Sequence, residues 1–181
     1  YKREPSFPIA VACDPAFNFV YEANIRYLHH LGEVTYFSPL ADTSLPDVGF
    51  VYLPGGYPEL YLAALSANRQ MLQSIRRYVE SGGKLLAECG GMMYLCDEIR
   101  DKNGDVYPMA GVLHQSATME NMKLRLGYRT LLYNETRLKG HEFHYSRLVE
   151  QQNPLPSCAV AYTAKGVETD TPLYHYKNVW A

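Results

Sequence analysis

The residues that most clearly could perform chemistry are Ala87-Glu88-Cys89-Gly90-Gly91, where a nucleophile-type side chain lies between an apolar run and two glycines. A strand, such a residue and then small residues that open a helix are typical of a nucleophile elbow, a tight turn that exposes the side chain. Gly90 and Gly91 leave room for this turn because they carry no side chain. A helix N-terminus favours the thiolate of Cys89, and the N–H of Gly90 can stabilise an oxyanion. The sequence therefore predicts Cys89 as a nucleophile.

Cys89 also admits a purely structural interpretation. Free cysteine is among the most buried residue types, so a cysteine before two glycines can serve only to pack a helix against a sheet. Ala87 occupies the position where the elbow usually has its first glycine, which weakens the pattern. By itself, the motif leaves catalysis and packing open.

A second glycine-bearing turn, Pro54-Gly55-Gly56, follows another short apolar run at 48–53. If that run is a strand beside the one leading to Cys89, a backbone N–H of this turn faces the thiol as a second oxyanion donor. The alternative is an ordinary Pro-Gly-Gly turn with Pro58 in the first turn of a helix. Two glycine turns at the carboxyl ends of neighbouring strands favour a site, because open α/β sheets bind ligands at that edge.

Strands and helices alternate over the first hundred residues. Apolar runs predict strands at 8–13, 34–37, 48–53 and 84–88, and periodic patterns predict helices at 18–31, 58–65, 69–79 and 92–99. This alternation with short links indicates a mainly parallel sheet with helices on both faces. After Asp101, short strands are predicted at 106–113, 123–133, 141–149, 158–163 and 173–176. We expect these to be antiparallel additions to the sheet or a small β layer beside it.

Size and composition restrict the class of protein. The 181 residues fit one domain, and 47% hydrophobic with 20% charged residues allow a full core. A net charge of −2 without a basic block argues against nucleic acid and anionic membranes as partners. The apolar runs are too short to span a bilayer, and residues 1–5 lack the apolar region of a signal peptide. Four cysteines without paired or zinc-type spacing predict reduced thiols in a cytoplasmic protein and no metal.

Five separated segments together resemble the glutaminase domain of the cobyrinic acid a,c-diamide synthase family, a class I glutamine amidotransferase of the cobyric and cobyrinic acid synthase type. In order along nearly the whole chain, they are CDPAFNFVYEANIRYL (Cys13–Leu28), PGGYPE (Pro54–Glu59), AECGGMMYL (Ala87–Leu95), LGYR (Leu126–Arg129) and GHEFHYS (Gly140–Ser146). The resemblance implies a flavodoxin-like, three-layer α/β domain over residues 1–181. It also implies cobalamin biosynthesis as the setting.

The resemblance assigns roles to residues and partners. Cys89 would form a thioester with glutamine, while the N–H groups of Gly56 and Gly90 hold the oxyanion. The released ammonia would amidate the a and c carboxylates of cobyrinic acid, a corrinoid, on an N-terminal synthetase domain of the same polypeptide. This chain has no GxxxxGK[ST] motif. We therefore expect ATP and Mg²⁺ to act on that synthetase domain, outside residues 1–181, and no cofactor within them.

A cysteine glutaminase also needs a general base, usually histidine. In the family the base lies in a Tyr-x-His motif just after the final strand, so we expect it beyond Ala181, with the domain truncated at its C-terminus. His175, in the expected final strand, is the alternative base within the chain. In a strand Glu142 and His144 share one face and can pair, and we expect the GHEFHYS segment to be structural or interfacial.

Two further residues are candidates for binding glutamine. A guanidinium such as that of Arg129 can hold the α-carboxylate bidentately, although an exposed strand arginine is the ordinary alternative. Glu59 is the second candidate, although an acidic residue that opens a helix also stabilises the helix dipole. Cys13, Cys96 and Cys158 are expected to pack in the interior.

Three other functions remain open from the sequence alone. The same domain can serve a related tetrapyrrole or cofactor amidoligase, because only the acceptor part would differ. A DJ-1-like cysteine hydrolase on the same fold is another candidate, although PGGYPE and GHEFHYS argue against it. The third is a non-catalytic binding module that keeps the elbow for packing.

Overall fold

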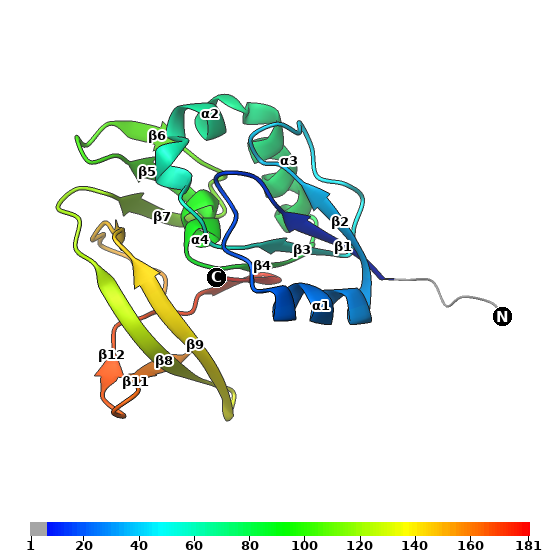
Figure 1. Ribbon diagram of the computed structural model, residues 1–181. Coiled ribbons are helices and arrows are strands. Elements are labelled where there is room, and N and C mark those ends of the chain that lie inside the picture. Colours follow the sequence, from blue (N-terminus) through cyan, green and yellow to red (C-terminus); the bar gives the residue numbers. More distant parts are fainter. Residues whose placement is uncertain (1–6) are drawn as a thin grey trace.

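A six-stranded sheet forms the centre of the protein, shown in Figure 1 as a computed structural model that describes residues 7–181. The polar start of the chain lies outside the described residues. The strand order is β13-β14-β4-β3-β1-β2. The strands are β1 (Phe7–Ala12), β2 (Gly32–Phe37), β3 (Phe50–Leu53), β4 (Lys84–Ala87), β13 (His175–Tyr176) and β14 (Val179–Trp180). All neighbours pair in parallel except β13, which runs antiparallel to β14. The order β2-β1-β3-β4-β14 is the flavodoxin-like arrangement, as expected.

Helices cover both faces of this sheet, which gives the expected three layers. They are α1 (Glu22–Leu31), a 3-10 turn η1 (Pro58–Leu60), α2 (Leu62–Ala67), α3 (Arg69–Glu80) and α4 (Gly90–Leu95). Figure 1 shows α1 below the sheet and α2 and α3 above it. Successive strand residues point to opposite faces. Val51 and Leu53 therefore join the main core with Ile75 of α3, whereas Tyr52 faces α1.

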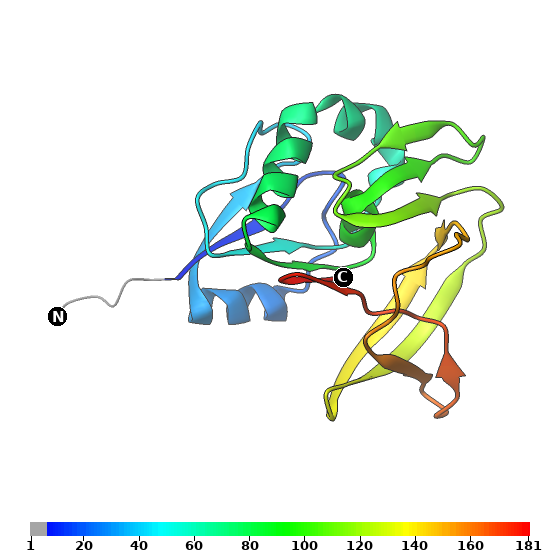
Figure 2. The ribbon, with the colours of Figure 1, turned by 180° about the vertical axis from the view of Figure 1, so that it is seen from behind.

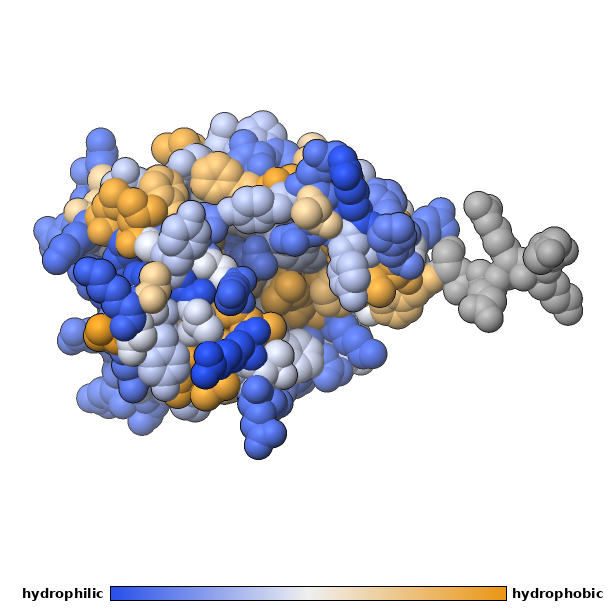
Figure 3. All heavy atoms as spheres, turned by 60° about the horizontal axis from the view of Figure 1, so that its bottom comes forward, coloured by the Kyte–Doolittle hydropathy of each residue, from blue (hydrophilic) through white to orange (hydrophobic). Residues whose placement is uncertain are grey.

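The layer under the sheet is thinner than the layer above it. Helix α1 contains no buried residue, and its half-buried Ile25 and Leu28 pack on a small cluster of Ile9, Val11 and Tyr52. Figure 3 brings this underside forward and shows hydrophobic surface near its middle among hydrophilic side chains. None of the helices formed by residues 7–181 combines the length and apolar character needed to cross a bilayer.

The C-terminal half adds two four-stranded sheets beside the central one. The first has the order β10-β7-β5-β6, with β5 (Cys96–Arg100), β6 (Val106–Pro108), β7 (Leu113–Thr118) and β10 (Arg147–Leu148). The second, which we call the arm, has the order β12-β11-β8-β9, with β8 (Arg125–Tyr133), β9 (Thr136–His144), β11 (Val160–Thr163) and β12 (Glu168–Thr169). Figures 1 and 2 both show the arm projecting from the central sheet. The expected β layer therefore exists as two sheets, and β5 and β7 pair in parallel rather than antiparallel.

Several expected boundaries are wrong. The helix predicted at 92–99 ends at Leu95, where strand β5 begins, and residues 18–21 precede α1 as extended chain. The run at 106–113 divides into β6 and the start of β7. The final strand is β14 and not the segment that contains His175. All four cysteines are free as expected, but only Cys96 is buried, so the packing role was wrong for Cys13 and Cys158.

Candidate active site

Cys89 lies in the turn between β4 and α4 with a strained backbone. Its φ of 50° and ψ of −109° place a non-glycine residue in a region that L side chains rarely adopt. Such conformations cost on the order of 1–3 kcal/mol and concentrate at functional sites. The geometry is that of the expected nucleophile elbow, and the residue reaches solvent.

The two glycine turns lie on the same rim of the sheet, as expected. Strands β3 and β4 pair in parallel with Leu53 beside Ala87, so the chain after each strand emerges at the same edge. A Cβ atom added to Gly91 would lie 2.2 Å from the carbonyl oxygen of Leu53, and one added to Gly90 would lie 3.2 Å from the backbone nitrogen of Gly56. At Gly91 only glycine permits this approach, and the close contact at both positions brings the main chains of the two turns together.

The amides of these turns are placed to receive a negative charge. The Gly90 N–H contacts the sulfur of Cys89 closely enough to lower the pKa of the thiol. Among residues 7–181, no carbonyl or side chain accepts a hydrogen bond from the Gly56 N–H. An N–H that is not engaged within the protein can donate to a ligand. We therefore retain both amides as candidate oxyanion donors.

Cys89 opens into a hollow between the central sheet and the arm. The remaining lining residues come from the loop before α1, the η1 turn, α4 and the end of β9: Phe19, Gly56, Tyr57, Glu59, Met93, Phe143, His144, Tyr145 and Ser146. The thiol of Cys89 donates to the carbonyl oxygen of Phe143 at 3.8 Å. Phe19 reaches the rim because its N–H donates to the carbonyl of Gly55 at 3.1 Å. The arm therefore forms one wall of the site.

The thiol of Cys89 is less acidic than expected. Desolvation of the sulfur by the walls of the hollow raises its pKa to about 11, the Gly90 N–H lowers it, and the carboxylates of Glu59, Glu88 and Glu142 raise it further. The expected preference of the helix N-terminus for a thiolate is therefore opposed by desolvation and by these carboxylates. Attack requires a base.

The substitution Glu59→Gln tests how nearby charge affects the pKa of Cys89. Removing the Glu59 charge lowers the pKa of Cys89, so we expect iodoacetamide to alkylate Cys89 of Glu59→Gln about twofold faster or more at pH 8, because the thiolate fraction rises tenfold per pKa unit. Alkylation at Cys89 is followed by peptide mass spectrometry between pH 7 and pH 11. Glu22→Gln, on exposed α1, changes net charge equally and should leave the rate unchanged. Equal rates for Glu59→Gln and the unmodified protein would contradict this account.

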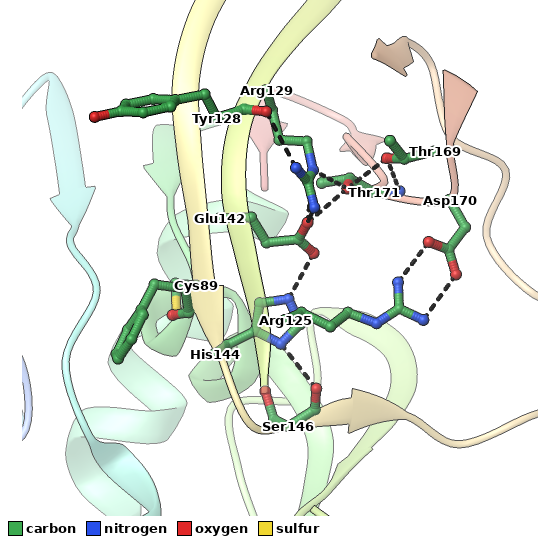
Figure 4. A network of polar contacts seen from close by, with 11 residues as sticks. Cys89, Arg125, Tyr128, Arg129, Glu142, His144, Ser146, Thr169, Asp170 and Thr171 are labelled. Atoms are coloured by element: carbon green, nitrogen blue, oxygen red, sulfur yellow. Dashed lines mark hydrogen bonds and ion pairs between the residues drawn. The ribbon is translucent and has the colours of Figure 1, made fainter. Parts of the chain in front are cut away.

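Arg129 does not line the hollow. Its guanidinium contacts the carboxylate of Glu142, with Nε 2.8 Å and Nη2 2.6 Å from Oε2, and it also reaches Thr171 and the carbonyl of Tyr128. Figure 4 shows this network behind the wall that faces Cys89. The donors expected to hold the α-carboxylate of glutamine are thus engaged within the arm. Glu59 does line the hollow, and burial raises its pKa.

His144 is the one histidine among residues 7–181 that lines the hollow, and it pairs with Glu142 as expected, with Nε2 2.7 Å from Oε1. His141 instead contacts the hydroxyl of Tyr21 at 2.9 Å. His175 stacks on Trp180 with ring centroids 4.5 Å apart. The GHEFHYS segment was expected to be structural or interfacial, and its last four residues line the hollow. Phe19 and Tyr57 were not expected there, since the sequence does not show that the loop before α1 folds over the glycine turn.

In the described part of the protein, the side chains are not placed to bind a metal ion together. No group of three or more His, Cys, Asp or Glu side chains within residues 7–181 is arranged to hold a metal ion. The site consists instead of a thiol, two adjacent backbone amides and a carboxylate. This combination suits nucleophilic attack on a carbonyl group.

Comparison with known proteins identifies the family. Residues 8–181 match the CobB/CobQ-like glutamine amidotransferase domain. The chain belongs to this family. The amidotransferase domain is 44% identical over 160 residues to the hydrogenobyrinate a,c-diamide synthase of Pseudomonas aeruginosa, covering 88% of this chain and 35% of that protein. It is 39% identical over 189 residues to the cobyrinate a,c-diamide synthase of Clostridium acetobutylicum, covering 99% of this chain and 42% of that protein.

The amidotransferase domain therefore spans less than half the length of these curated relatives. Among solved structures, it resembles PurLQS from Thermotoga maritima with a TM-score of 0.65 and 18% identity over 97% of this chain and 85% of the other. It also resembles a glutamine amidotransferase from Thermotoga maritima with a TM-score of 0.61 and 13% identity, over 98% of this chain and 74% of the other. These two likenesses support the fold of the domain.

Proposed function

We propose that this amidotransferase domain hydrolyses glutamine through a thioester on Cys89 and supplies the ammonia for amidation. The observation that carries the proposal is the strained Cys89 on the same rim as the adjacent main chains of Gly56 and Gly90. The family match and the names of the relatives support it.

The chemistry follows from the groups around the sulfur. A base takes the thiol proton of Cys89, and the sulfur attacks the carboxamide carbon of glutamine. The negative charge that develops on the carboxamide oxygen is stabilised by the N–H groups of Gly56 and Gly90. Collapse breaks the carbon–nitrogen bond, and the amine takes the proton from the base and leaves as ammonia. Water then hydrolyses the γ-glutamyl thioester, which releases glutamate and restores the thiol.

Glu59 is the group in the hollow that we propose for the α-ammonium of glutamine. Glu59 follows Gly56 by three residues and lines the hollow, and its charge acts on the sulfur of Cys89. A carboxylate in a partly buried site attracts a cation because the surrounding protein screens the charge less than water does. Arg129 is not part of this proposal, since Glu142 already occupies its guanidinium.

The acceptor of the ammonia is proposed from the relatives. Those proteins are named as diamide synthases of cobyrinate and hydrogenobyrinate, and this domain spans less than half of their length. We propose that a synthetase domain on the same polypeptide binds the corrinoid, ATP and Mg²⁺, and that ammonia amidates the a and c carboxylates there. An acceptor from a related tetrapyrrole pathway would leave the chemistry at Cys89 unchanged.

Labelling with a diazo-ketone analogue of glutamine tests the proposed site. We expect the analogue to modify Cys89 and no other cysteine, since only this thiol lies in the hollow that would hold glutamine. Peptide mass spectrometry locates the adduct. Excess glutamine should slow its formation, whereas an equal concentration of buffer salt should not. Iodoacetamide gives the matched measure of general thiol reactivity. Uniform modification of the exposed Cys13, Cys89 and Cys158, without protection by glutamine, would favour the binding-module alternative.

A further inference from the structure

Glu142 is the one charged residue within residues 7–181 whose side chain is buried, with 8% of the residue exposed. A buried charge is costly unless its neighbours supply charge and hydrogen bonds. Glu142 lies on β9 next to Phe143, whose carbonyl oxygen faces the thiol of Cys89. The partners of this carboxylate therefore bear directly on one wall of the site.

Both oxygens of the Glu142 carboxylate are engaged. Oε2 accepts a hydrogen bond from Nε of Arg129 and another, at 3.0 Å, from the hydroxyl of Thr171, and it forms an ion pair with Nη2 of Arg129. Oε1 contacts Nε2 of His144 at 2.7 Å. Figure 4 shows the four side chains meeting between β8, β9 and the segment after β12. Burial raises the pKa of Glu142, but the hydrogen bonds from His144 and Thr171 and the charge of Arg129 outweigh it, so the pKa lies below its usual value.

His144 has an acceptor at each ring nitrogen. Nε2 faces the carboxylate of Glu142, and Nδ1 lies 2.8 Å from the carbonyl oxygen of Ser146. A carbonyl oxygen and a carboxylate can only accept, so both contacts are hydrogen bonds only when the ring carries both protons. A doubly protonated imidazole has no lone pair. In this arrangement His144 cannot take the proton of Cys89.

The network fixes the wall opposite Cys89. His144 is tied to Glu142 on one side and to the Ser146 carbonyl on the other, so the turn at 143–146 is fixed at both ends. All four residues of that turn line the hollow. Arg129 on β8 and Thr171 after β12 hold Glu142 from behind, so the position of the wall depends on three segments of the arm.

We propose that Glu142 and His144, which is held at both ring nitrogens, are positioning residues that hold the 143–146 wall for glutamine. Arg129 and Thr171 complete the network by fixing Glu142. This inference rests on the proposed function, because it assigns the affinity of the same site for glutamine. The network affects glutamine binding through the placement of the wall and takes no proton from Cys89.

The main test is Glu142→Gln in the full-length protein. Without the charge, the contacts to Arg129 and His144 weaken and the wall shifts, so we expect KM for glutamine to rise about tenfold or more. The ammonia-dependent rate should stay unchanged, because that reaction does not use the hollow. Thr171→Val removes one hydrogen bond and keeps every charge, so it should raise KM in the same direction by a smaller factor even if Glu142→Gln folds poorly.

Asp170→Asn is the matched control. Asp170 pairs bidentately with Arg125 on the same arm, but both side chains are exposed and neither lines the hollow. Exposed pairs contribute little, so KM for glutamine should not change. An equal rise in KM for Asp170→Asn and Glu142→Gln would mean that general loosening of the arm, and not this network, is responsible.

His144→Gln separates positioning from base catalysis. A positioning role predicts a raised KM with kcat within about tenfold of the original, whereas loss of a general base lowers kcat by about 10²–10⁴-fold. Nitrogen-15 spectra of the histidine rings give an independent readout, with an N–H hydrogen bond expected at each ring nitrogen of His144. A single N–H, or a collapse of kcat at unchanged KM, would overturn the proposal.

The outcomes distinguish this inference from the proposed function. If the unmodified protein releases no glutamate from glutamine, the proposed function fails and the network has no substrate to position. If the unmodified protein hydrolyses glutamine and Glu142→Gln has the same KM, the proposed function stands and the positioning role is wrong.

Discussion

Replacing Cys89 with alanine is expected to lower glutamine-dependent amidation by at least about 10³-fold in the full-length protein, because no other group can form the thioester. Amidation with added ammonia should remain close to the original rate, since ammonia bypasses the hollow. Both rates are measured on the same preparation as amide formed on the corrinoid acid, with glutamate release followed in parallel.

Cys158→Ala is the matched control for this substitution. Cys158 is also an exposed free cysteine, but it lies outside the hollow that contains Cys89. Its removal should leave both rates unchanged. Loss of both the glutamine-dependent and the ammonia-dependent rate in Cys89→Ala would support the packing interpretation, in which this cysteine is needed for folding.

The central sheet could be predicted because its signal is local. Each strand is a short apolar run, and alternate residues such as Val51 and Tyr52 point to opposite layers. Glycine turns and the helices between the strands then indicate a parallel sheet. The pairing of β3 with β4, which brings Gly56 beside Gly90, was an assumption from the sequence and is confirmed by the register of Leu53 with Ala87.

The C-terminal half was less predictable because its strands depend on distant partners. Residues 96–100 continue a helical pattern, yet Cys96 starts a strand that pairs with both β6 and β7. Val179 and Trp180 form a strand of two residues that exists because β4 lies beside it. Neither pairing has a signal in the local sequence.

The candidate site, too, could be predicted from the sequence only in part. Cys89 was found from its own motif, whereas its high pKa arises from burial and from carboxylates that come from three separate segments. Arg129 was expected to bind glutamine. It lies on β8, which pairs with β9, and its guanidinium forms an ion pair with Glu142 of β9. Residue type and spacing identified the nucleophile. Its electrostatic environment required the tertiary structure.

The pKa of about 11 makes the origin of the general base decisive. Within residues 7–181 His144 is the one histidine that lines the hollow, and both of its ring nitrogens are engaged. His175, the alternative base, stacks on Trp180. We propose that the base follows Ala181 in a longer polypeptide. Strand β14 runs parallel to β4 with Trp180 beside Leu86, so a chain that continues past Ala181 leaves the sheet at the rim that carries Cys89.

Residues 1–181 alone are therefore expected to hydrolyse glutamine about 10²–10⁴-fold more slowly than a polypeptide that continues past Ala181 to its next histidine, which is the usual contribution of a general base. The diazo-ketone analogue should still label Cys89 in both, which shows that the hollow is intact. Glutamate release is measured for both proteins and for His175→Gln in each. Fast turnover by residues 1–181 that His175→Gln abolishes would instead make His175 the base, and would require its ring to leave Trp180 and turn toward the sulfur.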